Sequence, residues 1–179
     1  MLWPRLAKNL LARPLSEPPP AVDAAEVAAL AEQLDATARR RLGRSLAIRQ
    51  VDAGSCNGCE LEIAATQNVV HDLERYGLRF VASPRHADVL LVTGPVTRNM
   101  VEALARTRAA TPDPCFIVAV GDCALDGGVF KGSYAVEGGL AAEPRSSESV
   151  LRPDLRVAGC PPTPRQIIAA LLTLLAAQE

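Results

Sequence analysis

Aromatic residues are scarce in this chain: only 3% of its 179 residues are Phe, Trp or Tyr. Proteins that bind single-stranded nucleic acids stack the bases on such rings. The formal net charge of −1 at pH 7 also leaves no general basic surface for phosphate groups. The one local basic run, at residues 39–44, is typical of a solvated helix end. No nucleic-acid partner is expected.

A secretory signal is also lacking. The first residues contain no apolar segment followed by a small-residue cleavage site, and the cysteines number five, which is odd. A disulfide framework is therefore not expected, and a reducing cytoplasm is predicted. In that compartment, clustered cysteines more often indicate metal or redox chemistry.

No hydrophobic run is long enough to span a membrane. The longest covers residues 167–177, whereas a transmembrane helix needs about 20 apolar residues. This stretch is interpreted as a core helix. Hydrophobic residues still make up 49% of the chain, which is ample for a packed core of Ala, Val, Leu and Ile.

Apolar runs typical of strands alternate with segments of helical periodicity after residue 45. Alternation of this kind predicts a mainly parallel sheet with right-handed crossovers and helices on both faces. We expect an α/β fold of the flavodoxin-like, doubly wound type. The Gly-rich residues 121–150 are predicted to be irregular, and long loops of this kind are often functional. The predicted strands are residues 46–52, 79–82, 88–93, 115–120 and 155–158, and the predicted helices are residues 61–76, 97–108 and 165–177.

The N-terminal part carries no chemical motif. Residues 1–15 have the spacing of a short amphipathic helix, which suits docking to a partner, binding to a membrane surface or packing on the chain's own domain; partner docking is favoured. Three prolines at 18–20 form a stiff linker, and residues 22–42 are predicted to form a helix that Gly43 ends. We therefore divide the chain into a helical extension, residues 1–45, and an α/β domain, residues 46–179.

Four cysteines follow predicted strands: Cys56 and Cys59 after the first, Cys123 after the fourth and Cys160 after the last. The carboxyl ends of parallel strands meet at one edge of the sheet, which is where such folds bind ligands. Four Cys thiolates are the ligand set of a cubane iron–sulfur cluster. Cys115 heads a buried strand and is interpreted as a small core residue.

Two other uses of these cysteines compete with a cluster. Structural zinc sites with four Cys usually use two close pairs, whereas this chain has one pair and two single cysteines. A thioredoxin-like role for the Cys56–Cys59 pair would leave Cys123 and Cys160 unexplained. A zinc-stabilised interaction module without a redox role remains the alternative from a different class.

The motifs, taken in this order, resemble one family. The chain is similar to the single-cluster small subunit of membrane-bound NiFe hydrogenases of the formate hydrogenlyase type, which is related to the 20 kDa or B-type subunit of complex I. Complex I subunits carry two adjacent cysteines at the first site, where this chain has the spaced pair Cys56 and Cys59. The matching segments are residues 56–60, 83–88, 94–97, 121–124, 127–130, 133–134 and 159–162.

The resemblance implies one 4Fe-4S cluster held by Cys56, Cys59, Cys123 and Cys160, and no catalytic residue in this chain. It implies electron relay to or from the NiFe site of a large hydrogenase-like subunit, similar to the D-type subunit of complex I, together with a ferredoxin-like iron–sulfur subunit. The expected location is cytoplasmic, peripheral on the inner face of the cell membrane, held through integral subunits. A B-type subunit of an NADH:quinone oxidoreductase, passing electrons to quinone, is the alternative.

Other residues near the motifs receive lesser roles. Glu60 and Glu62 are interpreted as first-turn acids that complement a helix dipole, with a proton or partner contact near the cluster as the functional alternative. Tyr134 is assigned to a wall of the cluster or to the partner surface. Surface or capping roles are expected for His71 and His86. Arg85 and Arg98 are expected to be solvated charges, with a partner contact as the alternative.

Overall fold

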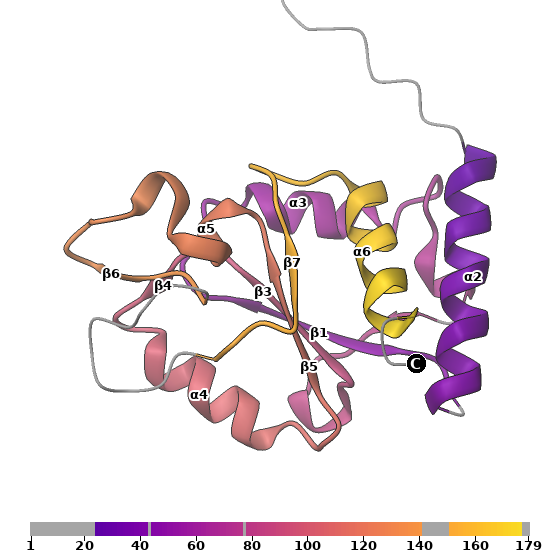
Figure 1. The fold of residues 1–179 in the computed structure, drawn as a ribbon, viewed down its shortest axis with the longest axis horizontal. Helices are drawn as coiled ribbons and strands as arrows, with labels where there is room; N and C mark the ends of the chain where they lie inside the picture. Colours follow the sequence, from indigo (N-terminus) through magenta and orange to yellow (C-terminus); the bar gives the residue numbers. More distant parts are fainter. Residues whose placement is uncertain (1–23, 43, 77, 141–150, 177–179) are drawn as a thin grey trace, which may run out of the picture.

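The structure is a computed structural model that describes residues 24–42, 44–76, 78–140 and 151–176. Within these residues a five-stranded sheet runs through the centre of the molecule (Figure 1), and its neighbouring strands all pair in parallel. Its order, β2-β1-β3-β5-β7, is the 2-1-3-4-5 order of flavodoxin-like folds, so the predicted α/β class is confirmed. The strands are β1 (Ala47–Asp52), β2 (Arg79–Phe80), β3 (Val89–Thr93), β5 (Phe116–Val120) and β7 (Leu155–Val157).

Helices cover both faces of the sheet, because its central strands are apolar on both sides. Every residue of β3 is buried. In Figure 1, α2, α3 and α6 lie on one side of the sheet and α4 on the other. A fully buried parallel strand of this kind requires both layers. The helices are α2 (Ala24–Leu42), α3 (Gly58–Ala65), α4 (Val101–Ala110), α5 (Asp122–Asp126) and α6 (Pro164–Ala176).

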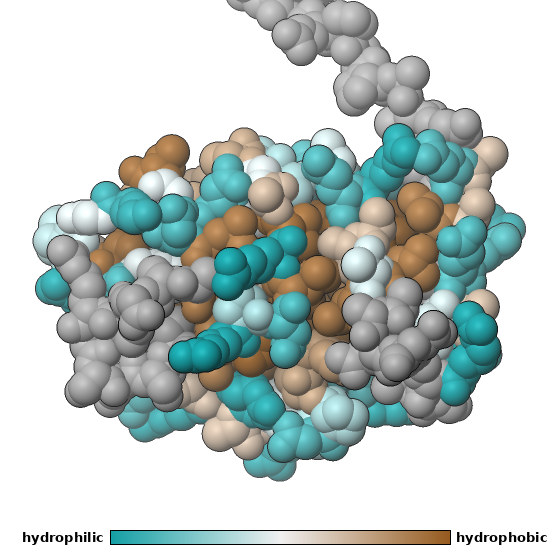
Figure 2. Space-filling view, in the orientation of Figure 1, coloured by the Kyte–Doolittle hydropathy of each residue, from teal (hydrophilic) through white to brown (hydrophobic). Residues whose placement is uncertain are grey.

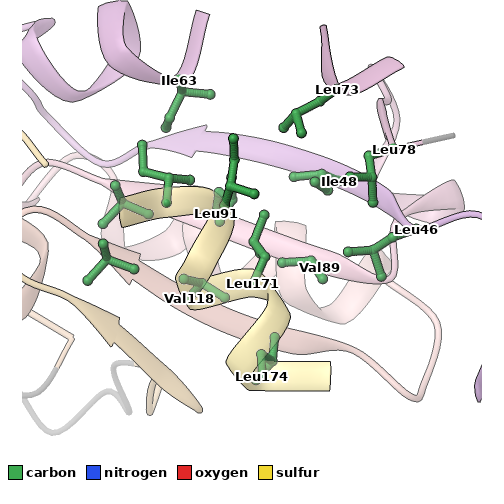
Figure 3. Close-up of a cluster of buried hydrophobic side chains, with 14 residues drawn as sticks. Leu46, Ile48, Ile63, Leu73, Leu78, Val89, Leu91, Val118, Leu171 and Leu174 are labelled. Atoms are coloured by element: carbon green, nitrogen blue, oxygen red, sulfur yellow. The ribbon is translucent and has the colours of Figure 1, made fainter. Parts of the chain in front are cut away.

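The core on the α6 side fixes the last helix against the sheet. Figure 3 shows Leu171 and Leu174 of α6 beside Val89 and Leu91 of β3. Four α6 side chains, including Ile167 and Ile168, are at most 5% exposed. Burying each contributes about 1.5–3 kcal/mol relative to exposure, so α6 is held firmly at the end of the loop that carries Cys160.

The start of α6 is set locally. Thr163 and Gln166 form a capping box, in which the Thr163 amide donates to Gln166 Oε1 at 2.8 Å and the Gln166 amide donates to Thr163 Oγ1 at 3.4 Å. Pro164, at the first helical position, has its backbone angle already set for a helix. The predicted helix at 165–177 is therefore confirmed over residues 165–176 and begins one residue earlier than predicted, while residue 177 lies outside the described residues.

The described part of the N-terminal extension is α2, which confirms the predicted helix from residue 24 onward. It packs along α6, and an ion pair joins Arg165 of α6 to Glu26 of α2. Figure 2 shows apolar surface between α2 and α6, bordered by hydrophilic side chains. The amphipathic helix predicted at residues 1–15 lies outside the described residues, and the division at residue 45 stays a prediction.

The helix predicted at residues 61–76 is wrong beyond Ala65. The chain turns there because Asn68 Oδ1 accepts hydrogen bonds from the amides of Val70 and His71, at 2.9 and 3.0 Å. A short 3₁₀ helix, Leu73–Tyr76, follows. Side chains such as Asn compete with helical hydrogen bonding in this way.

His71 is buried, so the surface position is wrong, whereas its contact with the last residue of α3 agrees with the capping role that was the other expectation. Its Nδ1 lies 3.0 Å from the carbonyl oxygen of Ala65 and 3.1 Å from Asn68 Oδ1. The ring therefore holds the end of α3 against the turn that follows. His86 is exposed, as expected.

The helix predicted at residues 97–108 also begins later, at Val101. The preceding residues form β4 (Val96–Thr97), which pairs antiparallel with β6 (Val136–Gly138). The region predicted to be irregular, residues 121–150, contains α5, the 3₁₀ helix Gly128–Phe130 and β6 among its described residues. The late start of α4 follows from Thr97, whose amide and hydroxyl both donate to the Ala53 carbonyl, at 3.0 Å each. In the described residues no helix is both long and apolar enough to cross a bilayer.

Candidate metal centre

A pocket of about 120 Å³ lies where the carboxyl ends of the strands meet. The structure brings all four predicted cysteines to this pocket, from the loops that follow β1, β5 and β7. Cys115 stands elsewhere, half-buried at the head of β5, as expected for a packing residue. We call this space the sulfur pocket; it is lined by Ser55, Cys56, Gly58, Cys59, Gly94, Asp122, Cys123, Gly159, Cys160 and Pro161.

The loop that carries Cys56 is shaped by its own side chains. Asp52, at the end of β1, accepts hydrogen bonds through Oδ1 from the amides of Gly54 and Ser55, both at 2.7 Å. Asn57 then takes a left-handed conformation, with φ of 71°. This reversal places Cys56 before α3 and Cys59 within its first turn, so one short loop presents two thiols.

Two glycines leave room for sulfur. A Cβ on Gly121 would lie 2.5 Å from Cys59 Sγ, and a Cβ on Gly128 would lie 2.9 Å from Cys123 Sγ. Both glycines also have positive φ, 88° and 48°, which favours glycine over other residues. The backbone of the Cys123 loop, residues 121–128, therefore passes directly against two of the four sulfurs.

The loop that carries Cys160, residues 158–163, is joined to the Cys123 loop. The Gly159 amide donates to Asp122 Oδ1 at 2.8 Å, and the Asp122 amide donates to the Gly159 carbonyl at 2.9 Å. Cys123 is buried, whereas Cys160 and Cys56 are exposed. The pocket therefore has a buried wall and an open side.

The thiols affect one another electrostatically. Burial raises the pKa of Cys59 to about 12, with Glu60 and the other three cysteines of the pocket contributing in the same direction. Burial also raises the pKa of Cys123, with Cys160, Cys56 and Asp122 adding to the effect. Without metal, both thiols stay protonated at neutral pH, so metal binding must displace their protons.

The donor set fits an iron–sulfur cluster. In a cubane cluster the four thiolates each hold a different iron, so the sulfurs surround the cluster, whereas the four ligands of a zinc ion converge on one point. Among the described residues, no three His, Cys, Asp or Glu side chains converge as a single ion would require. Four thiols around one pocket, with glycines clearing space beside the sulfurs, match the first pattern; their role as ligands stays a prediction.

Sequence reasoning missed the carboxylates that shape the site. Asp52 had a usable signal, because an Asp two residues before Gly is typical of an Asx turn. Asp122 had no such signal, because its bond to Gly159 joins segments far apart in the chain.

Glu60 lies in the first turn of α3 as expected, yet both of its carboxylate oxygens are buried without a hydrogen-bond partner.

Exposed apolar side chains occur in the segments that follow the cysteines. Leu61, which follows Cys59 in α3, is 63% exposed, and Val129 and Tyr134, after Cys123, are 79% and 84% exposed. Tyr134 does not line the pocket, so its role at a partner surface stays a prediction. Arg98 is exposed, as expected for a solvated charge, and it also pairs with Glu137 at 3.0 Å.

Comparison with known proteins identifies the family. Residues 56–174 match the family described as NADH ubiquinone oxidoreductase, 20 Kd subunit. The chain is 41% identical over 131 residues to formate hydrogenlyase subunit 7 of Escherichia coli strain K12, covering 73% of this chain and 49% of that protein. The chain thus spans about half the length of that relative.

Other relatives agree. The chain is 40% identical over 134 residues to the probable membrane-bound hydrogenase subunit mbhJ of Pyrococcus furiosus, covering 75% of this chain and 76% of that one. It is 38% identical over 116 residues to the B-type subunit of the NADH-quinone oxidoreductase of Citrifermentans bemidjiense, covering 65% of this chain and 64% of the relative.

A solved structure shares the fold. A chain in the structure of the membrane-bound sulfane sulfur reductase, an archaeal respiratory membrane complex, superposes with a TM-score of 0.62 and 27% identity, covering 81% of this chain and 74% of that one. The resemblance drawn from the cysteine motifs is confirmed, and the relatives are subunits of oxidoreductase complexes. This chain belongs to the family of the 20 kDa subunit of NADH ubiquinone oxidoreductase.

Proposed function

We propose that this protein is the electron-transfer subunit of a membrane-associated, hydrogenase-like complex and holds one 4Fe-4S cluster. The observation that carries the proposal is the sulfur pocket, where four cysteines from three strand-end loops face one space. Cys56, Cys59, Cys123 and Cys160 would each bind one iron as thiolate. The cluster, when bound, supplies one-electron redox chemistry.

The chain's own residues prepare the site rather than react. Gly121 and Gly128 keep the space beside two sulfurs open, and the loop backbones fix the directions of the four thiols. Asp122 is the only carboxylate that lines the pocket among the described residues, and Oδ1 of its side chain accepts a bond from the Gly159 amide. Such an arrangement suits electron relay without acid–base catalysis.

A partner would cover the open side of the pocket. Leu61 in α3, two residues after Cys59, and Val129, which follows Gly128, are exposed apolar side chains, and a contiguous apolar surface around the pocket would mark a protein interface. We propose a large NiFe hydrogenase-like subunit as the partner, a ferredoxin-like iron–sulfur subunit as the other electron carrier, and a peripheral position on the cytoplasmic face of the membrane through integral subunits.

The Cys56–Cys59 spacing favours the hydrogenase branch over the quinone-reducing one, because the complex I subunits carry adjacent cysteines there. The matches to formate hydrogenlyase subunit 7 and to the probable membrane-bound hydrogenase subunit also cover more of this chain, 73% and 75%, than the match to the quinone oxidoreductase relative, at 65%. A B-type subunit that passes electrons to quinone remains the second candidate, supported by that relative.

The test is the iron and acid-labile sulfide content of protein prepared without oxygen, with EPR spectra of the reduced sample. About four irons and four sulfides per chain are expected. Cys123→Ser and Cys160→Ser should lose the EPR signal, whereas Cys115→Ser, outside the pocket, should keep it. Stoichiometric zinc without sulfide would overturn the proposal in favour of a non-redox module.

A further inference from the structure

We propose that Asp122 is a positioning residue that holds Cys160 in place for the cluster, by joining the Cys160 loop to the Cys123 loop. The inference rests on the proposed function. It concerns a carboxylate that is not a ligand, and it follows from the hydrogen bonds that cross between the two loops.

The sheet stops just short of Cys160. The last rung between β5 and β7 is the bond from the Gly121 amide to the Val157 carbonyl, at 2.8 Å. Two residues later, Gly159 is bonded on both sides to one residue: its amide donates to Asp122 Oδ1 at 2.8 Å, and its carbonyl accepts from the Asp122 amide at 2.9 Å. Asp122 therefore extends the connection between the strands beyond the sheet.

Both neighbours of this connection are cysteines of the pocket. Asp122 directly precedes Cys123, and Gly159 directly precedes Cys160. Cys123 is buried against the core, whereas Cys160 is exposed. The side-chain bond of Asp122 thus couples the position of the exposed thiol to that of the buried one. After Cys160, regular structure begins again only at α6, which the capping box of Thr163 starts.

The chain contains a matched control at the other end of the same two strands. Asp154, just before β7, accepts a bond through Oδ2 from the Ile117 amide of β5, at 2.7 Å. It joins β7 to β5 by the same chemistry but away from the sulfur pocket. Because both are carboxylate bonds to a backbone amide, losing either should lower the unfolding temperature to a similar degree, so a difference in metal loading between the two variants isolates the effect on the site.

The experiment compares the full chain with Asp122→Ala, Asp122→Asn and Asp154→Ala, each reconstituted with iron and sulfide without oxygen. Iron and sulfide per chain, the EPR spectrum of the reduced protein and the unfolding temperature of the metal-free protein are measured. Asp122→Ala should lose at least half of its iron, whereas Asp154→Ala should load like wild type. Asp122→Asn retains Oδ1 as an acceptor and should restore loading.

Two results would overturn the proposal: equal loading of Asp122→Ala and Asp154→Ala, or failure of Asp122→Asn to restore loading although its metal-free form unfolds at the wild-type temperature. A wild-type chain that takes up no iron would instead contradict the proposed function. Hydrogen exchange of the Gly159 amide in the metal-free protein distinguishes failure of the loop connection from failure of the proposed function, because it needs no iron. Protection lost in Asp122→Ala and kept in Asp122→Asn supports the loop connection independently of the cluster.

Discussion

The position that a Cβ of residue 121 would occupy lies 2.5 Å from the Sγ of Cys59. Gly121 follows β5 and Cys59 lies in the first turn of α3, and the missing side chain of Gly121 is what allows the two segments to approach. Gly121 has φ of 88° and ψ of 155°, a region that is essentially restricted to glycine. Space and backbone conformation therefore both require glycine beside this sulfur.

The variant Gly121→Ala should displace Cys59 and abolish most of the iron uptake. Backbone strain alone should lower the free energy of unfolding by about 1–3 kcal/mol, and the contact with Sγ adds to this. The measurement is iron per chain after reconstitution, together with urea unfolding of the metal-free protein.

Gly132→Ala is the control for backbone strain. Gly132 has φ of 82°, and its Cβ would meet no atom within 4 Å. It should lose stability without losing iron. If both variants load iron as wild type does, the close approach of residue 121 to Cys59 has no role in the site.

The parts of this molecule that follow from local patterns were predictable. The apolar run of β3 and the last helix follow from residues next to one another in sequence, and the four cysteines converge because parallel strands end at one edge. The end of α3 was not predictable from periodicity, because Asn68 and His71 form a competing turn. The bond from Gly159 to Asp122 depends on the approach of two loops that no local pattern reports.

The metal-free protein should lose stability as pH rises through 9.0, the ordinary pKa of a cysteine thiol, because folding raises the pKa of Cys59 to about 12. Above 9.0 the unfolded chain releases this proton while the folded chain retains it. The unfolded state then binds fewer protons, so the free energy of unfolding falls with increasing pH.

Urea unfolding under reducing, oxygen-free conditions at pH values between about 7 and 10 checks this expectation. Cys59→Ser removes the titrating group and should flatten the decline, although the raised pKa of Cys123 leaves part of it. Identical pH profiles for wild type and Cys59→Ser would contradict the assignment of the effect to Cys59.

In the metal-free chain without a partner subunit, the buried carboxylate of Glu60 should lower the free energy of unfolding. Both of its carboxylate oxygens are buried without a hydrogen-bond partner, and an unpaired buried acceptor costs about 1–3 kcal/mol. Glu60→Gln removes the charge and should raise the free energy of unfolding of the metal-free chain by about 1 kcal/mol. Glu62→Gln, two residues along the same helix, is the control and should change it little. A loss of stability in Glu60→Gln would show that the carboxylate has a favourable partner in solution.

The apolar surface beside the sulfur pocket should be needed for assembly. Val129 is 79% exposed and follows Gly128, where an added Cβ would lie 2.9 Å from Cys123 Sγ. Val129→Asp places a charge where we propose that the large subunit docks, and desolvating an unpaired charge is costly. It should reduce copurification of the large subunit by about tenfold or more.

Val69 offers the matched control, because it is the same residue type, is 98% exposed and lies in the turn after α3 rather than in a cysteine loop. Val69→Asp should leave copurification unchanged, and both variants should retain iron, since neither position lines the pocket. Equal loss of the partner in both variants would indicate that a broader surface, reaching beyond the end of α3, forms the interface. Unchanged copurification in both would place the large subunit on another face of this chain. A different subunit would then have to bury the open side of the sulfur pocket.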